Sequence, residues 1–413
     1  MCFAIVVCVA KFKIDENECF GTFMTLNFDS ARLPNVFETD EHQEWRTHLR
    51  KFFDKEIIPF ANEWDEKGEI PKSLWTKSAA MGILGLGYPE KFGGTSEGID
   101  IWHKNILSDE FARVGAGGVG ATLMVHNIAL PPVINFAQEH IKDEVAVDVI
   151  KGLKRISLAI TEPDAGSDVA QLRTTARREG DYYIVNGSKT YITGGMNANW
   201  FTTAVRTGDD GAKGVSALLI PADTQGVSRT LLDKKQGWWC SDTATIYFDD
   251  VRVPVENLLG AENQGFKVIM HNFNSERMAM SSSMEGSARV CLEEAVMWAK
   301  ERKTFGQRLA DHQVIRHKIA EMTRKIHATN AYLQVVSRQI QLGKEDAASI
   351  ALLKVQASQT MEFCAREAMQ ILGGVGYMRG NRVERIYREV RVNAIGGGSE
   401  EIMRDLATRQ LQL

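Results

Sequence analysis

The chain has 413 residues, of which 44% are hydrophobic and 25% charged, and it carries 49 Lys and Arg against 53 Asp and Glu. This composition is typical of a globular protein with a large core, and the slight excess of acid argues against nucleic acid as a partner. The six Cys form no CxxC pair, which argues against a disulfide framework and favours a reducing compartment, the cytoplasm or, in a eukaryote, the mitochondrial matrix.

The first residues carry an apolar run at 2–10 that is shorter than the roughly 20 residues a membrane span requires. No basic segment precedes this run, and acidic residues follow it where a mitochondrial presequence would carry Arg. We therefore expect no membrane span. We interpret residues 1–23 as a misassigned start, with the functional chain beginning near Met24 and an arm extending to residue 37. An ordered N-terminal arm is the alternative.

Residues 38–155 are predicted to be helical. Thr39 can cap a helix whose first turn carries Asp40 and Glu41, acids that the positive end of the helix dipole favours. The pattern GAGGVG at 115–120 matches a dinucleotide-binding motif, but a helical sequence precedes it where that motif requires a strand. We interpret it as a turn between two helices.

Residues 156–264 change to short β-type runs separated by Gly, Asn and Asp, which predicts an antiparallel β domain. Residues 265–413 return to long helices, and an apolar seam with steps of four and three indicates a four-helix bundle. The seam consists of Ile315, Ile319, Met322, Ile326, Thr329, Leu333, Val336 and Ile340. Gly343 and Gly373 are expected to end two of these helices. The expected fold class is α+β, in the order helical domain, β domain, helical bundle.

Two segments of the β domain are suited to a ligand. Residues 158–168, LAITEPDAGSD, end a β run in a turn where Gly166 permits close backbone approach and the hydroxyls of Thr161 and Ser167 can donate hydrogen bonds. Residues 187–195 form a strand with an aromatic residue and a Thr, and it ends in two Gly. From the residues alone, an ordinary surface turn is an equally good explanation of each segment.

Taken together, these segments resemble the acyl-CoA dehydrogenase family of flavoproteins, and the resemblance extends in order over residues 38–413. The family's ITEPxAGSD stands at 160–168, its GKxWITNG strand at 187–194 and its QILGGxGY at 370–377, and its ERKTFG motif precedes the bundle seam. The loop motifs are most similar to the isovaleryl- and long-chain subgroup. The resemblance implies an FAD-dependent enzyme acting on acyl-CoA, an electron-transfer flavoprotein as electron acceptor, and a homotetramer or homodimer.

The resemblance also implies where FAD binds. Thr161 would bond the pyrimidine edge of the flavin, Thr193 would lie at N5, and Tyr191 stands where the family has Trp. Helical segments, in this family usually from a neighbouring subunit, would hold the pyrophosphate and adenosine, and Arg302 offers a planar fork for phosphate. The implied cofactor residues are Leu158, Ala159, Ile160, Thr161, Gly166, Ser167, Tyr191, Ile192, Thr193, Arg302, His312, Gln313, Gln370, Ile371, Leu372, Gly373, Gly374, Ser399, Glu400 and Glu401. The implied substrate residues are Ser167, Asn274, Arg277, Gly396 and Gly398, and no metal ligands are expected.

The catalytic base is the main departure from the family pattern. Many members carry a Glu in an IYEGT loop before the last helix, but here the loop reads IGGGS and the Glu position is Gly397. In the isovaleryl- and long-chain subgroup the Glu lies on an earlier helix, and Glu276 matches that position. A solvated Glu276 paired with Arg277 is one alternative, and a base at Glu400 or Glu401 is another.

We predict that Glu276 removes the α-proton of an acyl-CoA while the β-hydrogen leaves as hydride to flavin N5, because a carboxylate in an apolar pocket has a raised pKa. The backbone N–H of Gly397 can polarise the thioester carbonyl. Gly396 and Gly397 replace a Tyr and a Glu, so we expect the pocket to take a branched or a medium or long acyl chain. An enoyl-CoA-type reductase and a flavin oxidase on the same scaffold are the alternatives.

Overall fold

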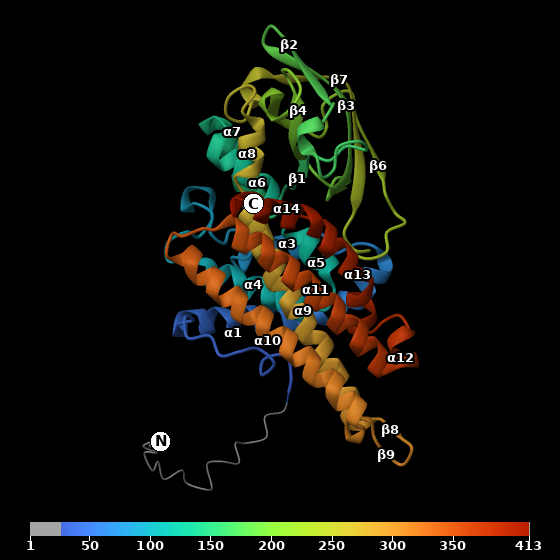
Figure 1. Cartoon of the computed structure of the whole chain (residues 1–413). Coiled ribbons are helices and arrows are strands. Elements are labelled where there is room, and N and C mark those ends of the chain that lie inside the picture. The colour runs from blue at the N-terminus through green and yellow to red at the C-terminus, as the bar shows by residue number, and fades with distance from the viewer. Residues whose placement is uncertain (1–25, 413) are drawn as a thin grey trace, which may run out of the picture.

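The structure of the chain is a computed structural model that describes residues 26–412. The expectation of a misassigned start at residues 1–23 therefore lies outside the described residues. Helices α1–α7, a curved sheet and a long helical bundle follow one another along the chain (Figure 1). This order is the one predicted from the residue patterns.

The N-terminal region is built from short helices that pack around one another. Thr39 precedes the first of them, and its backbone N–H donates to Nδ1 of His42 at 2.9 Å, as expected of a helix start. Gly115 lies between two helices with φ +65°, as predicted for a helix–helix turn, and the second helix begins within the GAGGVG segment at Gly117. The helices are α1 (Asp40–Glu56), α2 (Ala61–Lys67), α3 (Ser73–Ala80), α4 (Ile101–Arg113), α5 (Gly117–Leu123), α6 (His126–Phe136) and α7 (Glu139–Ile150).

One segment of this region, Gly117–Phe136, is long and apolar enough to cross a membrane by length and composition, and half of it is buried within the protein. It comprises the two helices α5 and α6. Thr202 of the sheet donates to the carbonyl of Ala129 in α6 at 2.7 Å, and both residues are buried. These contacts are typical of a core helix that covers a sheet.

The β domain contains a seven-stranded sheet of order β1-β4-β2-β3-β7-β6, with β5 paired to β4. Most pairs are antiparallel, as predicted, but both β1 and β2 pair with β4 in parallel, with Ile156 opposite Trp200 and Thr175 opposite Arg206, so the prediction of a wholly antiparallel domain is wrong and the sheet is mixed. The alternation of apolar residues reports which face is buried and carries no information about strand direction. The strands are β1 (Ile156–Ala159), β2 (Thr175–Glu179), β3 (Tyr182–Thr193), β4 (Trp200–Arg206), β5 (Val215–Pro221), β6 (Val227–Leu231) and β7 (Thr243–Pro254).

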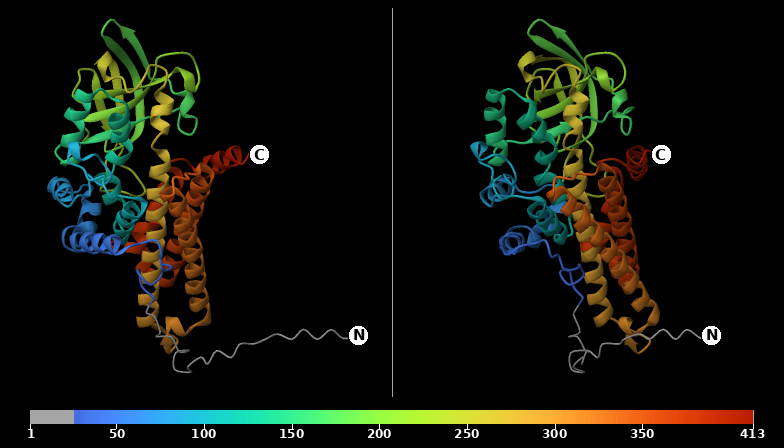
Figure 2. Two further views of the ribbon diagram at one scale, coloured as in Figure 1. Left: turned by 90° about the vertical axis from the view of Figure 1, so that its left-hand side faces the viewer. Right: turned by 60° about the vertical axis from the view of Figure 1, so that its left-hand side comes forward.

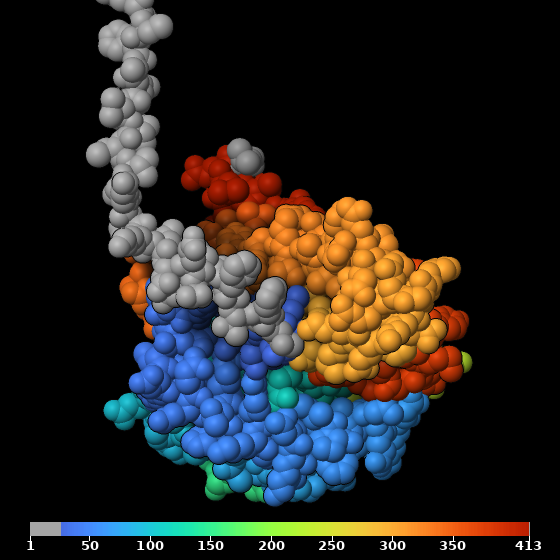
Figure 3. Space-filling model, turned by 90° about the horizontal axis from the view of Figure 1, so that it is seen from below, coloured from blue at the N-terminus to red at the C-terminus, as the bar shows by residue number. Residues whose placement is uncertain are grey.

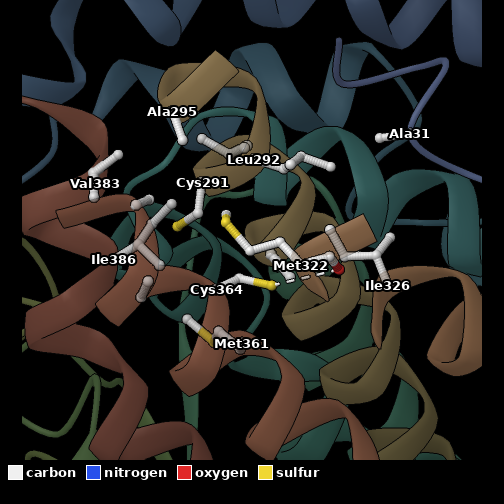
Figure 4. Packing of buried hydrophobic residues seen from close by; sticks show 14 of the residues in the cluster. Ala31, Cys291, Leu292, Ala295, Met322, Ile326, Met361, Cys364, Val383 and Ile386 are labelled. Carbon is white, nitrogen blue, oxygen red and sulfur yellow. Dashed lines mark hydrogen bonds between the residues drawn. The ribbon is translucent and has the colours of Figure 1, made fainter. Parts of the chain in front are cut away.

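The C-terminal region is a bundle in which α9, α10, α11 and α13 pack together. Figure 4 shows its core, where Met322 and Ile326 of the predicted seam meet Cys291 from α9 and Cys364 from α11. Gly373 follows α11 with φ +63° and ends it, as expected. The elements are α8 (Gly265–Met270), α9 (Phe273–Glu301), β8 (Lys303–Thr304), β9 (Gln307–Arg308), α10 (Gln313–Gln341), α11 (Ala347–Leu372), α12 (Gly374–Tyr377), α13 (Arg382–Ile395) and α14 (Glu400–Gln410).

The N-terminal helices lie against the bundle, and Figure 3 shows the two regions in contact on the side seen from below. Buried charges join them: Arg46 of α1 donates to Asp109 of α4 at 2.7 Å, and Arg289 of α9 contacts the same carboxylate. Arg289 is also paired with Glu285 at 3.0 Å. Because an unpaired charge at this depth would be costly, the network holds the two regions in one relative orientation.

Candidate active site

Glu276 lies in the first turn of α9, where the helix dipole favours an acid, and its side chain is partly buried. Burial raises the pKa of Glu276 from its ordinary 4.5 to about 6, although the positive charges of Arg277 and Lys354 oppose the shift. A carboxyl group with this pKa is mostly ionised at neutral pH and is a stronger base than an exposed Glu. The side chain therefore has the properties that the predicted base requires.

The side chains of two cationic residues donate hydrogen bonds to backbone carbonyls at the loop between α13 and α14. Nε of Arg277 donates to the carbonyl of Gly397 at 3.2 Å, and Nζ of Lys354 donates to the carbonyl of Gly398 at 2.7 Å and to that of Asn393 at 3.2 Å. Across residues 26–412, no protein acceptor receives the N–H of Gly397. This N–H is therefore available to a ligand.

The carboxylate of Glu276 faces the backbone of Gly397. A Cβ placed on Gly397 would lie 3.7 Å from Oε1 of Glu276 and 2.9 Å from Sδ of Met280. Glu276 therefore brings its carboxylate to the place where a side chain on the loop would begin. The space that the two loop glycines were expected to open is partly filled, because Cε of Met280 also lies 3.8 Å from a Cβ placed on Gly396.

The two predicted flavin segments of the β domain lie side by side. The backbone N–H of Thr190 donates to the carbonyl of Thr161 at 2.8 Å, which joins the 158–168 turn to the end of β3. Within the described part of the chain, the hydroxyls of Thr161, Ser167 and Thr193 have no protein partner. A Cβ on Gly166 would meet no atom within 4 Å, so the turn is open to a neighbour.

Tyr191 has an unusual conformation at this site. It is 69% exposed and has φ +59°, at an irregularity in the β3–β7 pairing. A bulky residue in the left-handed region is strained, and such strain is concentrated at functional sites. The side chains of Ala159, Ile160 and Ile192 are buried, and that of Leu158 is half-buried, so the three buried residues can meet a cofactor only through their backbone.

A buried ion pair that the sequence interpretation missed supports the flavin segments. Nζ of Lys189 lies 2.7 Å from Oε1 of Glu162 and donates to the carbonyl of Ile160 at 3.0 Å. The carboxylate of Glu162 also accepts the backbone N–H groups of Arg173 at 2.6 Å and Thr174 at 2.9 Å. Burial lowers the pKa of Lys189 to about 8, and the charge of Glu162 opposes this shift. A Lys in a strand whose neighbours alternate between buried and exposed is the signal that could have identified it.

Arg302, His312 and Gln313 flank the β8–β9 hairpin at the far end of the bundle from the β domain, and residues 370–374 lie where α11 is followed by α12 (Figures 1 and 2). Arg302 follows α9 and is exposed, and Nε2 of His312 lies 3.2 Å from Oγ1 of Thr304. Gln313, Gln370, Gly373 and Gly374 are exposed residues, whereas the side chains of Ile371 and Leu372 are in the bundle core. Within one chain the two predicted groups of cofactor residues therefore lie apart.

The start of α14 carries the last predicted residues. Oγ of Ser399 accepts the N–H of Ile402 at 3.4 Å, so Ser399 caps this helix. The carboxylate of Glu400 accepts from Oγ of Ser358 at 2.6 Å and is thus directed toward α11, and Glu401 is exposed. This geometry favours Glu276 over both as a base.

The start of α9 carries two predicted substrate residues. Asn274 accepts a hydrogen bond from Arg277 at 3.1 Å and donates one to Glu345 at 2.6 Å. The guanidinium of Arg277 also holds the carbonyl of Gly397, so part of its hydrogen-bonding capacity is used within the protein. Both side chains nevertheless lie next to Glu276 in the chain, beside the loop that carries Gly396 and Gly398.

Known proteins provide an independent comparison. Family models described as acyl-CoA dehydrogenase N-terminal, middle and C-terminal domains match residues 39–152, 157–251 and 263–412. "Acyl-CoA dehydrogenase AFT10-1" of Alternaria alternata is 38% identical over 406 residues, which cover 92% of this chain and 94% of that protein. The mitochondrial long-chain specific acyl-CoA dehydrogenase of Rattus norvegicus is 32% identical over 376 residues, which cover 90% of this chain and 87% of that protein. The crystal structure of a probable acyl CoA dehydrogenase from Mycobacterium abscessus has a TM-score of 0.88 at 41% identity, covering 91% of this chain and 100% of that one.

Proposed function

Since the chain belongs to the acyl-CoA dehydrogenase family, whose members are FAD-dependent oxidoreductases, we propose that it introduces an α,β double bond into an acyl-CoA thioester with Glu276 as the base. The observation that carries the assignment is the 3.7 Å between Oε1 of Glu276 and a Cβ built on Gly397. A carboxylate on α9 thus reaches the region that a loop Glu would reach in other members. The loop itself offers no side chain that could take a proton at this point.

The residues present fit FAD. The hydroxyls of Thr161, Ser167 and Thr193, without partners among the described residues, the open turn at Gly166 and the exposed, strained Tyr191 belong to two segments that the hydrogen bond from Thr190 to Thr161 joins. Hydroxyl donors bind the polar edge of a heterocycle, and an aromatic side chain can cover its face. When bound, FAD supplies the acceptor for the β-hydrogen, which leaves the substrate as hydride.

The chain's own residues prepare the substrate for this transfer. Glu276, ionised above about pH 6, takes the α-proton. The N–H of Gly397 donates to the thioester carbonyl and stabilises the negative charge that develops on its oxygen as the proton leaves. Because Arg277 holds the carbonyl of Gly397, the peptide that follows the one carrying this donor is anchored before substrate binds.

We further propose a branched or a medium or long acyl chain as substrate. The side chain of Met280 lines the space beside Gly396 and Gly397, and Met adapts to irregular apolar shapes because it is unbranched and flexible. The relative from rat is named for long chains.

The separation of the two cofactor groups supports a homotetramer or homodimer, and an electron-transfer flavoprotein is the proposed electron acceptor. The proposed location is the cytoplasm, or the mitochondrial matrix in a eukaryote.

Anaerobic stopped-flow absorbance of the FAD-loaded protein tests this function. Butyryl-, octanoyl-, palmitoyl- and isovaleryl-CoA are mixed with wild type, with Glu276→Gln and with Ser275→Ala, an exposed neighbour that serves as control. We expect the branched or longer substrates to bleach the flavin of wild type and of the control, and Glu276→Gln to remain oxidised. If no acyl-CoA bleaches the flavin, the proposed function is wrong. If Glu276→Gln is bleached as fast as wild type, the assignment of Glu276 as the base is wrong. If butyryl-CoA bleaches the flavin fastest, the proposed substrate class is wrong.

A further inference from the structure

Lys354 of α11 is a buried cation without a counter-ion in contact. Its side chain is 1% exposed, and no carboxylate of the described residues lies within 4.0 Å of its Nζ. Its hydrogen-bond partners are the carbonyls of Gly398 and Asn393, at 2.7 and 3.2 Å. Removing a cation from water without an ion pair is costly, so the position requires an explanation beyond packing.

We propose that Lys354 is a positioning residue for the dehydrogenation, one that orients the Gly397 donor toward the substrate carbonyl and places a positive charge beside the carboxylate of Glu276. The proposal deepens the function proposed above and rests on it. It assigns Lys354 two separable effects, hydrogen bonding to the loop and charge next to the base.

The hydrogen bonds act on both sides of Gly397. Lys354 holds the carbonyls of Asn393 and Gly398, and Arg277 holds the carbonyl between them, that of Gly397. The carbonyl oxygens of this stretch are thus turned toward cations on α9 and α11, while the N–H of Gly397 has no partner among the described residues. Three successive glycines have little conformational preference of their own, so anchors on both sides of the Gly396–Gly397 peptide must limit the orientations open to it.

The charge acts across Gly397. A Cβ built on Gly397 would lie 3.6 Å from Cε of Lys354 and 3.7 Å from Oε1 of Glu276, so the two side chains approach the same point. The charged groups that face Glu276 are Arg277 on its own helix and Lys354 on α11. Those that face Lys354 are Glu276 and Arg277 from α9 and Glu400 from α14. Lys354 therefore favours the ionised form of Glu276 and also the negative charge that develops on the substrate oxygen.

Two variants separate these effects. Lys354→Met keeps the length of the side chain and removes both the donor and the charge, while Lys354→Gln keeps a donor for the loop carbonyls and removes only the charge. Lys325→Met makes the same substitution at a half-exposed Lys on α10 and is the matched control. Thermal unfolding of each FAD-loaded variant gives its stability independently of its chemistry.

The readout is the pH at which a bound 3-thia-acyl-CoA loses its α-proton, followed by the long-wavelength absorbance of the enzyme complex. This probe can give up its α-proton but has no β-hydrogen to transfer. We expect the midpoint to rise by about one pH unit in both Lys354 variants, because an opposite charge at this range shifts a carboxyl pKa by about that amount or more. Flavin reduction by substrate should slow at least ~10-fold in Lys354→Met, as for loss of a preorganised donor, and less in Lys354→Gln.

A wild-type midpoint in Lys354→Gln would overturn the charge effect, even if Lys354→Met does not fold. A lower unfolding temperature with an unchanged midpoint in both variants would reduce Lys354 to a structural residue and would also overturn the proposal. If wild type neither deprotonates the probe nor is reduced by any acyl-CoA, the proposed function itself is wrong. The loss of signal would then be common to all the proteins rather than specific to Lys354.

Discussion

Replacing Glu276 by Gln is predicted to stabilise the folded chain at neutral pH although it removes the proposed base. The pKa of Glu276 is raised from 4.5 to about 6 by burial, so the folded state binds this proton more tightly than the unfolded chain does. The contribution of Glu276 to stability is therefore greatest below about pH 4.5 and falls as the pH rises through about 6. One pKa unit corresponds to about 1.4 kcal/mol, so the shift costs the wild type about 2 kcal/mol at neutral pH.

The assay compares chemical unfolding of FAD-loaded wild type, Glu276→Gln and Ser275→Ala at several pH values between about 4 and about 8. The buried Glu285 and Glu389 also have raised pKa values, about 8 and about 7, but they are present in every variant, so the difference isolates Glu276. The stability of Glu276→Gln relative to wild type should increase by about 2 kcal/mol from the acidic to the neutral end. Parallel pH dependences for the two proteins would refute the reasoning that Glu276 is held in a desolvated environment.

Three further substitutions test the parts that support the site. Gly397→Ala should lower the unfolding temperature and abolish reduction of the flavin by acyl-CoA, because Gly397 has φ +67° and its Cβ would lie 2.9 Å from Sδ of Met280. The control is Gly211→Ala, at a glycine with φ +85° and no atom within 4 Å of its Cβ, and it should retain this reduction. Lys189→Met leaves the buried Glu162 without its ion-pair partner and should cost about 3–5 kcal/mol of stability, measured by unfolding. It should also weaken FAD retention, measured by release of FAD fluorescence. Retention as in wild type would contradict a supporting role of the Lys189–Glu162 pair in FAD binding. Ser399→Ala should cost about 1 kcal/mol through loss of the α14 cap, measured by thermal unfolding, and no change would exclude that cap.

Much of the fold could be predicted because its helices follow simple periodic rules. The seam on α10 placed Met322 and Ile326 in the bundle core, and Thr39 was identified as a helix start from residue type. The direction of β1 relative to β4 could not be predicted, because parallel and antiparallel strands present the same alternation of buried residues.

The site was only partly predictable. Glu276 and the glycine loop were identified from motifs, but the filling of the expected space by Met280 depends on how α9 packs against that loop. Lys189 and Lys354 were missed, because neither a Lys in a strand nor a Lys within an apolar helical run indicates which carbonyl or carboxylate it meets until the fold is known. The structural role of such residues is a property of tertiary contact rather than of local sequence.

The most direct test of the central claim, that Glu276 takes the α-proton, measures exchange of that proton without oxidation. A 3-thia-acyl-CoA labelled with deuterium at its α-carbon is incubated with FAD-loaded protein in ordinary water, and loss of the label is followed by mass spectrometry. We predict rapid loss with wild type and with Ser275→Ala, and a rate at least ~100-fold lower with Glu276→Gln, in keeping with removal of a general base. Exchange at the wild-type rate in Glu276→Gln would contradict the claim and would assign the proton transfer to another group.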